Sequence, residues 1–337
     1  MGMRQQALVW ERDGRQWPLR HASRFVEAAG LRWHVQVMGP QIGQAPVVWL
    51  LHGTGASTHS WRSVMPLLAH RCQVVAVDLP GHAFTAMPAQ GAMSPQFSLH
   101  GMARALQTLM QTTGLLPDLL VGHSAGAALA ARMCLDQLVA PALLVSVNGA
   151  LLPLEGVAGF IFSPMARWMA STMFVPRMFA RRAADPRMRE RLIAATGSVI
   201  DPTGQALYGR LMQHPGHASA ALAMMANWNL QVLARDLPRL QTPVHLAIGT
   251  GDRTVPPAQA AQVHALLPAH PRSVVSSLGS LGHLAHEENP LAFAQQLLAL
   301  IDVGDALSDA RSPCDGTQAP TRRRDIGMST VGGLEAL

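Results

Sequence analysis

The chain has 337 residues, of which 49% are hydrophobic and 14% are charged, so it can bury a large core. Its formal net charge is +6, and all 26 basic residues are arginines, which are scattered and accompanied by no nucleic-acid-binding motif. This pattern argues against nucleic acid as a partner. Three cysteines without metal-ligand spacing predict no disulfide framework and no metal site. Neither a signal peptide nor a membrane-spanning run is evident, so we expect a cytoplasmic protein.

The first half of the chain alternates strand and helix patterns after a polar start at residues 1–22. Residues 24–39 alternate in polarity around a central glycine, which predicts a hairpin. The apolar runs PVVWLLHG (46–53) and QVVAVDLPG (73–81) are typical of buried parallel strands, and residues 57–70 between them have helical spacing. Residues 98–114 predict a second helix that ends at Gly114.

The second half repeats this alternation around a helical interruption. We expect a strand at 118–122, a helix at 124–137, strands at 142–147 and 243–249, a helix at 256–267, a strand at 272–278 and a helix at 290–301 capped by Asn289. These patterns predict a doubly wound α/β domain, residues 1–150 and 236–302, with helices on both faces of the sheet. Residues 151–235 contain only helical patterns and are interpreted as an inserted lid, here called the lid segment. Residues 303–337 lose periodicity and predict a disordered tail.

The stretch GHSAG at residues 122–126 follows a strand and precedes a helix. A Gly-x-Ser-x-Gly sequence in this context is typical of a nucleophile elbow, in which a strained turn lifts the serine above the sheet. A tight turn with small residues chosen for packing is the alternative. We predict that Ser124 is a nucleophile, which requires a nearby base.

His283 lies in the loop between the last strand and the last helix and is our candidate base, with His286 as the competing choice. Asp252 follows the strand at 243–249 and is our candidate for the acid that orients the base. Asn148, at the end of the preceding strand, has no charge to stabilise an imidazolium. For the oxyanion we predict the backbone N–H groups of Ala125 and Thr54, the latter in a glycine-rich loop. No metal or organic cofactor is required by this chemistry.

The motifs HGTG, DLPGH, GHSAG, GDRTVPP and GHLAHEENP resemble the α/β-hydrolase superfamily over residues 24–302. The stretches LLHGTGASTHSWR, NGALLPLEG, FSPMAR and ALAMMANWNL resemble, more narrowly, the magnesium-chelatase accessory proteins of bacteriochlorophyll biosynthesis, the BchO type. This resemblance implies an α/β-hydrolase fold with an eight-stranded, mostly parallel sheet. It also implies a role beside Mg insertion into protoporphyrin IX, association with the chelatase, and a place beside the photosynthetic membrane.

The lid segment is rich in Met and Phe and then in Arg. We expect its apolar face to cover Ser124; contact with a membrane is the other interpretation. The arginines could bind substrate carboxylates such as porphyrin propionates. His214 and His217 are expected to be surface or hydrogen-bonded residues rather than ligands of a metalloporphyrin. The predicted substrate pocket contains Trp61, Phe160, Phe162, Met224 and Trp228.

Three functions remain open from the sequence. The first is a serine hydrolase of the esterase type that acts on an ester-like bond of a large apolar substrate, such as a porphyrin. The second is a non-catalytic accessory protein that binds a porphyrin or the chelatase. The third is a generic carboxylesterase or C–C hydrolase. Dehalogenases and epoxide hydrolases are disfavoured because they need Asp at position 124.

Overall fold

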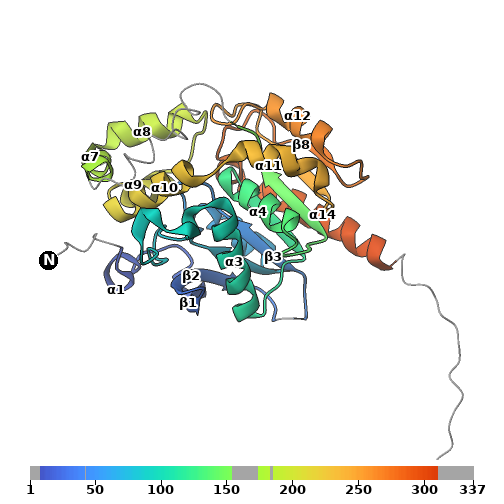
Figure 1. Ribbon diagram of the computed structural model, residues 1–337, viewed down its shortest axis with the longest axis horizontal. Helices are drawn as coiled ribbons and strands as arrows, with labels where there is room; N and C mark the ends of the chain where they lie inside the picture. Colours follow the sequence, from blue (N-terminus) through green and yellow to red (C-terminus); the bar gives the residue numbers. More distant parts are fainter. Residues whose placement is uncertain (1–7, 42, 154–173, 183–184, 310–337) are drawn as a thin grey trace, which may run out of the picture.

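The computed structural model describes residues 8–41, 43–153, 174–182 and 185–309. Its centre is one eight-stranded sheet with the strand order β1-β2-β4-β3-β5-β6-β7-β8 (Figure 1). The pairs β1–β2 and β2–β4 are antiparallel and the other neighbours are parallel, which confirms the predicted α/β sheet. The strands are β1 (Ser23–Ala28), β2 (Leu31–Met38), β3 (Val47–Leu51), β4 (Gln73–Val77), β5 (Leu119–His123), β6 (Leu143–Val147), β7 (Val244–Ile248) and β8 (Val274–Ser277).

The central strands are buried on both faces because apolar residues occupy both side-chain directions. In β3, Trp49 and Leu51 pack with the helices on one face, whereas Val48 and Leu50 pack on the other. The first face is covered by α3 (Leu99–Thr113), α4 (Ala125–Leu135) and α12 (Ala258–Leu266), and the second by α2 (Met65–Leu68) and α14 (Pro290–Asp309). Successive strand residues point to opposite faces, so continuous apolar runs are what a sheet between two helix layers requires.

Two helices differ from the sequence prediction. The helix expected at 57–70 is a short 3-10 turn, η2 (Thr58–Trp61), followed by the one-turn helix α2. The last helix starts at Pro290 behind Asn289, as expected, because the Asn289 side chain accepts from the N–H of Ala292. It continues to Asp309, so residues 303–309, which were predicted to belong to the disordered tail, are helical. The rest of that predicted tail, residues 310–337, lies outside the described residues.

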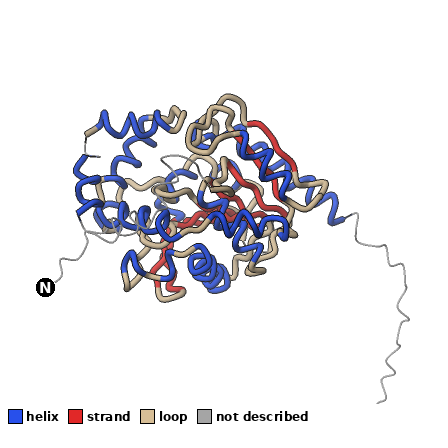
Figure 2. Tube along the Cα trace, turned by 45° about the horizontal axis from the view of Figure 1, so that its top comes forward, coloured by secondary structure: helices blue, strands red, loops and turns tan. Residues whose placement is uncertain are grey.

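The described part of the lid segment is helical and follows β6. In Figure 1 its first helices lie at one end of the molecule, and Figure 2 shows them as a group of tubes beside the strands. They are α7 (Phe174–Arg182), α8 (Pro186–Ala195), α9 (Pro202–Met212), α10 (Pro215–Asn227) and α11 (Leu230–Asp236). The remaining short elements are α1 (Trp10–Asp13), η1 (Arg20–Ala22), η3 (Gly91–Met93), η4 (Pro95–Phe97), η5 (Leu237–Arg239) and α13 (Ala285–Glu288). Among the described residues, no helix is both long and apolar enough to cross a membrane.

Candidate active site

The candidate site lies where the strand order reverses. The chain passes from β3 to β4 on one side, and β5 then pairs with the opposite edge of β3. Loops that leave the carboxyl ends of β3 and β5 therefore diverge and open a crevice, the usual position of a ligand site in an α/β sheet. Thr54 follows β3 and Ser124 follows β5, so the topology places both predicted residues at this crevice.

The turn from β5 into α4 holds Ser124 in a strained conformation. Its φ is 52° and its ψ is −119°, a backbone conformation that residues other than glycine rarely adopt. The turn is tight enough that a Cβ at Gly122 would lie 2.4 Å from the Ala127 nitrogen, and one at Gly126 would lie 2.3 Å from the Leu51 oxygen. Both glycines are therefore sterically required, and Ser124 is half-buried above the sheet with the N-terminus of α4 beneath it.

His283 and Asp252 meet although they follow different strands, β8 and β7. His283 Nδ1 lies 2.8 Å from Asp252 Oδ2. The other carboxylate oxygen, Oδ1, accepts the N–H groups of Thr254 at 2.7 Å and Val255 at 2.9 Å. These bonds fix the carboxylate, which can then hold the Nδ1–H tautomer of the imidazole and leave Nε2 to accept a proton.

Asn148 holds the loop that carries His283. Its side-chain nitrogen donates to the carbonyl oxygens of Gly282 and His283, both at 2.9 Å, and its oxygen accepts the N–H of Gly249 at 2.8 Å. From the sequence, Asn148 was weighed only as a candidate for the group that orients the base, and this role was missed. The ring of His123 adds a further bond, because its Nε2 lies 2.9 Å from the His283 carbonyl oxygen.

Ser124 and His283 line one cavity of about 510 Å³, without a direct hydrogen bond between their side chains. Catalytic hydrogen bonds are often long before substrate binds. The core contributes loops that follow β3, β5, β6, β7 and β8, and the lid segment contributes mostly apolar side chains. The lining residues from the lid segment are Leu192, Ile193, Thr196, Tyr208, Met212, His217, Ala218, Ala221, Leu222, Met225, Trp228 and Leu230.

Two unused backbone donors border the cavity beside Ser124. The N–H groups of Thr54 and Ala125 have no acceptor among the described residues, and both residues line the cavity. Ala125 is the first residue of α4, where an N–H has no partner within the helix. An oxyanion formed on a substrate bound to Ser124 could accept from both.

His52 orients the Thr54 donor. Its Nδ1–H donates to the Gly53 carbonyl at 2.8 Å, and its Nε2 accepts the N–H of Leu79 at 2.9 Å. The Gly53 carbonyl and the Thr54 N–H belong to one planar trans peptide and point in opposite directions, so holding the first directs the second. Burial lowers the pKa of His52 to about 4, which keeps the ring neutral and able to accept.

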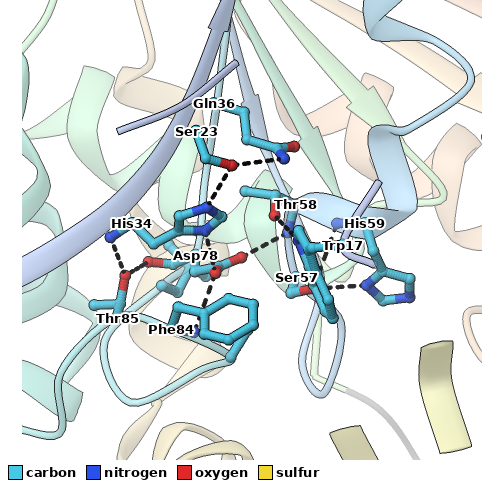
Figure 3. A network of polar contacts seen from close by, with 12 residues as sticks. Trp17, Ser23, His34, Gln36, Ser57, Thr58, His59, Asp78, Phe84 and Thr85 are labelled. Carbon is cyan, nitrogen blue, oxygen red and sulfur yellow. Dashed lines mark hydrogen bonds and ion pairs between the residues drawn. The ribbon is translucent and has the colours of Figure 1, made fainter. Parts of the chain in front are cut away.

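A second polar network supports the loops on either side of this site (Figure 3). Asp78, at the end of β4, lies 2.6 Å from His34 Nδ1 and accepts the N–H groups of Thr58 at 2.7 Å and Phe84 at 3.2 Å. Burial alone would raise the pKa of Asp78, but His34, His52 and the N–H of Thr58 lower it to about 2. The charged carboxylate therefore ties the loop after β3 to the loop after β4.

The predicted pocket residues are only partly brought together. Trp228 lines the cavity. Trp61 does not line it. Its side chain is fully buried against His286 and Phe293, in the core between the sheet and the helices α2 and α14, so this prediction was wrong. Met224 is also corrected, because it is buried in the core, where its sulfur lies 3.9 Å from the Thr54 hydroxyl, and the neighbouring Met225 lines the cavity instead.

Phe160 and Phe162 lie outside the described residues. His286 is fully buried, and both of its ring nitrogens lack a partner, so it is not placed to act as the base.

Charged side chains lie around the described cavity rather than in it. No arginine is among its described lining residues. Arg62 instead pairs with Glu287 at 2.5 Å and Asp201 at 2.6 Å behind the cavity wall. In the part of the chain that the structure describes, no three His, Cys, Asp or Glu residues are grouped to hold a metal ion.

Comparison with known proteins agrees with this fold. Residues 46–290 match the family described as the alpha/beta hydrolase fold. The chain is 40% identical over 271 residues to the magnesium-chelatase 30 kDa subunit of Rhodobacter capsulatus, which covers 80% of this chain and 91% of that protein. The chain therefore belongs to the α/β-hydrolase family and, within it, to the family of that magnesium-chelatase subunit.

Solved structures show the same fold at low identity. A bacterial membrane phospholipase A superposes with a TM-score of 0.66 at 22% identity, over 84% of this chain and 86% of that one. An esterase from Thermogutta terrifontis superposes with a TM-score of 0.63 at 19% identity, over 84% of this chain and 98% of that one. Both agree with the predicted fold class.

Proposed function

We propose that this protein is a serine hydrolase that acts on an ester-like bond of a large apolar substrate. The observation that carries the proposal is the strained Ser124, which lines a large apolar cavity together with His283, the hydrogen-bond partner of Asp252. A tight turn that served only packing would not need an imidazole, its carboxylate and two free N–H donors around one hydroxyl.

The reaction follows from the positions of these groups. The Ser124 hydroxyl attacks the acyl carbon and its proton passes to Nε2 of His283, while Asp252 stabilises the imidazolium through Nδ1–H. The N–H groups of Thr54 and Ala125 stabilise the oxyanion, and His283 then gives its proton to the leaving group. A water molecule, activated by the same imidazole, releases the acyl group from Ser124.

The cavity favours an apolar substrate. Its volume of about 510 Å³ falls in the range of sites for small organic molecules, and most of its lid residues are Leu, Ile, Met and Ala. Trp228 offers an aromatic face for a planar ring. The identity to the Rhodobacter capsulatus subunit supports a role beside magnesium insertion into protoporphyrin, with association with the chelatase. A protein that only binds a porphyrin there is the second candidate.

Labelling with a fluorophosphonate tests the first proposal. We expect the native protein to be labelled and to hydrolyse p-nitrophenyl esters, and Ser124→Ala to do neither. Equal labelling of both would contradict it. If Ser124→Ala retains full function in pigment synthesis while protoporphyrin IX quenches the tryptophan fluorescence of both proteins, the binding function takes its place.

The outer face of the lid segment supports peripheral contact with an anionic membrane. Arg177, Arg181 and Arg182 on α7, and Arg187 and Arg191 on α8, are exposed. The next residues of α8, Leu192 and Ile193, line the cavity, so a membrane bound at this face would lie close to the substrate site.

Sedimentation with vesicles tests this contact. We expect binding to phosphatidylglycerol vesicles that weakens with salt, and about thirtyfold weaker binding for Arg181→Gln/Arg182→Gln, at about 1 kcal/mol per arginine. The control Arg24→Gln/Arg104→Gln removes the same charge from exposed positions in β1 and α3. If both double variants lose vesicle binding equally, the effect comes from the net charge of the protein and not from a binding face on the lid segment.

A further inference from the structure

Three histidines hold the loop that carries Thr54. In this loop the N–H of Ala56 donates to the Gly53 carbonyl at 3.1 Å, and Gly55 has a φ of +76°, as a turn with glycine at its third position requires. His52 holds the peptide between Gly53 and Thr54, as described above. The next peptide is held by His82, whose Nε2 accepts the N–H of Gly55 at 3.4 Å.

The third histidine comes from the lid segment. His217, on α10, is buried, and its Nε2 lies 3.0 Å from the carbonyl oxygen of Gly55, which belongs to the peptide between Gly55 and Ala56. Its Nδ1 accepts the N–H of Ala83 at 3.1 Å. Because that N–H can only donate, Nδ1 is unprotonated and Nε2 carries the hydrogen that Gly55 accepts. Three consecutive peptides of the loop are therefore each held by one imidazole.

Both nitrogens of His217 are occupied by protein groups, so the ring has none left for a metalloporphyrin. Burial, together with the neighbouring His82, lowers the pKa of His217 to about 3, and the ring centroids of the two histidines lie 5.1 Å apart. A neutral ring is the form that both hydrogen bonds require. Since His52 and His82 belong to the core, His217 is the one of these three imidazoles that makes the position of the loop depend on the lid segment.

We propose that His217 is a positioning residue, through which the closed lid segment fixes the loop that points the Thr54 N–H at the oxyanion. This inference rests on the proposed serine hydrolase and extends it to the lid segment. The oxyanion exists only in the transition state and the tetrahedral intermediate, so the loss of His217 should affect kcat more than KM.

Three variants test this role. In His217→Ala, the Gly55 carbonyl and the Ala83 N–H both lose their partner. His217→Gln offers an amide N–H for Gly55 and an oxygen for Ala83. Asn227→Ala is the control on the same helix, because the Asn227 side chain bonds only to the Ala223 carbonyl of α10 itself.

We expect His217→Ala to hydrolyse a p-nitrophenyl ester with a kcat about 10- to 100-fold lower, somewhat less than the direct loss of an oxyanion donor causes. KM should change by less than about threefold. His217→Gln should recover at least part of the rate, and Asn227→Ala should match the native enzyme. A trifluoromethyl ketone, which forms an oxyanion on Ser124, should bind His217→Ala more weakly by a similar factor. Amide hydrogen exchange should be faster in residues 53–57 of this variant.

The proposal is overturned if His217→Ala keeps the kcat of Asn227→Ala. It is also overturned if kcat and KM worsen together without recovery in His217→Gln, because that result indicates a damaged lid. If the native protein neither hydrolyses esters nor reacts with fluorophosphonate, the proposed function fails instead. Hydrogen exchange then decides the positioning role alone, and unchanged exchange at residues 53–57 overturns it.

Discussion

The hydroxyl of Tyr208 on α9 donates a 2.7 Å hydrogen bond to Glu287 Oε1 on α13, which joins the lid segment to the helix that follows the His283 loop. Tyr208 is the only tyrosine of the chain and lines the cavity. The other oxygen of Glu287 accepts from Arg62, which also bonds to Asp201 at the start of α9. One buried carboxylate thus connects the cavity wall, the core and the lid segment.

Removal of the Tyr208 hydroxyl should destabilise the protein. In Tyr208→Phe, a buried oxygen of Glu287 loses its donor, which costs about 1–3 kcal/mol of the free energy of unfolding. Met212→Leu, a change of similar volume without a polar group in the same wall, is the control and should cost less. Chemical denaturation measures both, and an unchanged Tyr208→Phe would show that the bond contributes nothing.

Glu287 should give the stability a distinctive pH dependence. Burial raises its pKa from 4.5 to about 7, against the effect of Arg62. Between these pH values the folded state binds a proton that the unfolded state has released. The contribution of Glu287 to the free energy of unfolding therefore falls as pH rises through this window, and it stays low above pH 7.

Glu287→Gln removes this titration. We compare the free energy of unfolding of the native protein with that of the variant. The difference, native minus variant, should decrease by up to about 3 kcal/mol between pH 4.5 and 7 and should be constant below and above this range. Denaturation at a series of pH values checks this. A difference that is constant, or that rises with pH, would mean that Glu287 is ionised throughout.

Strain at Ser124 should be measurable as stability. Its φ of 52° suits glycine, so Ser124→Gly should relieve strain that Ser124→Ala retains. Neither variant has a nucleophile, which makes them a matched pair. We expect Ser124→Gly to be more stable by about 1 kcal/mol, after the greater unfolded-state entropy of glycine is counted. If Ser124→Ala is the more stable of the two, the turn is not strained.

Replacement of Asn148 by aspartate should impair the candidate active site. Asn148→Asp cannot donate to the Gly282 and His283 carbonyls, so the His283 loop loses two of the bonds that hold it. We expect ester hydrolysis at least about tenfold slower, because small misplacements of a catalytic group are costly. Asn229→Asp is the control, since Asn229 uses only its side-chain oxygen, as the cap of α11. Full activity in Asn148→Asp would show that Asn148 is not needed to hold this loop.

The sequence by itself determined the features that depend on neighbours along the chain. Alternating and continuous apolar runs predicted the sheet, because side-chain direction in a strand has a period of two. The motif around Ser124 predicted a tight strand-to-helix turn. The steric need for Gly122 arises within the turn, against Ala127, whereas Gly126 is required by the backbone of Leu51 on β3. The order of Ser124, Asp252 and His283 along the chain also agreed with the resemblance to the α/β hydrolases.

Only the tertiary structure decided which side chains face the cavity. On α10 consecutive side chains point about 100° apart, and the helix is apolar nearly all round, so the sequence could not separate Met224 from Met225. A lone Trp61 likewise carries no sign of which face of the sheet it will join. His217 meets Gly55 from 162 residues away, and a hydrogen bond at that separation exists only once the lid segment has packed onto the core. No local pattern could have predicted it.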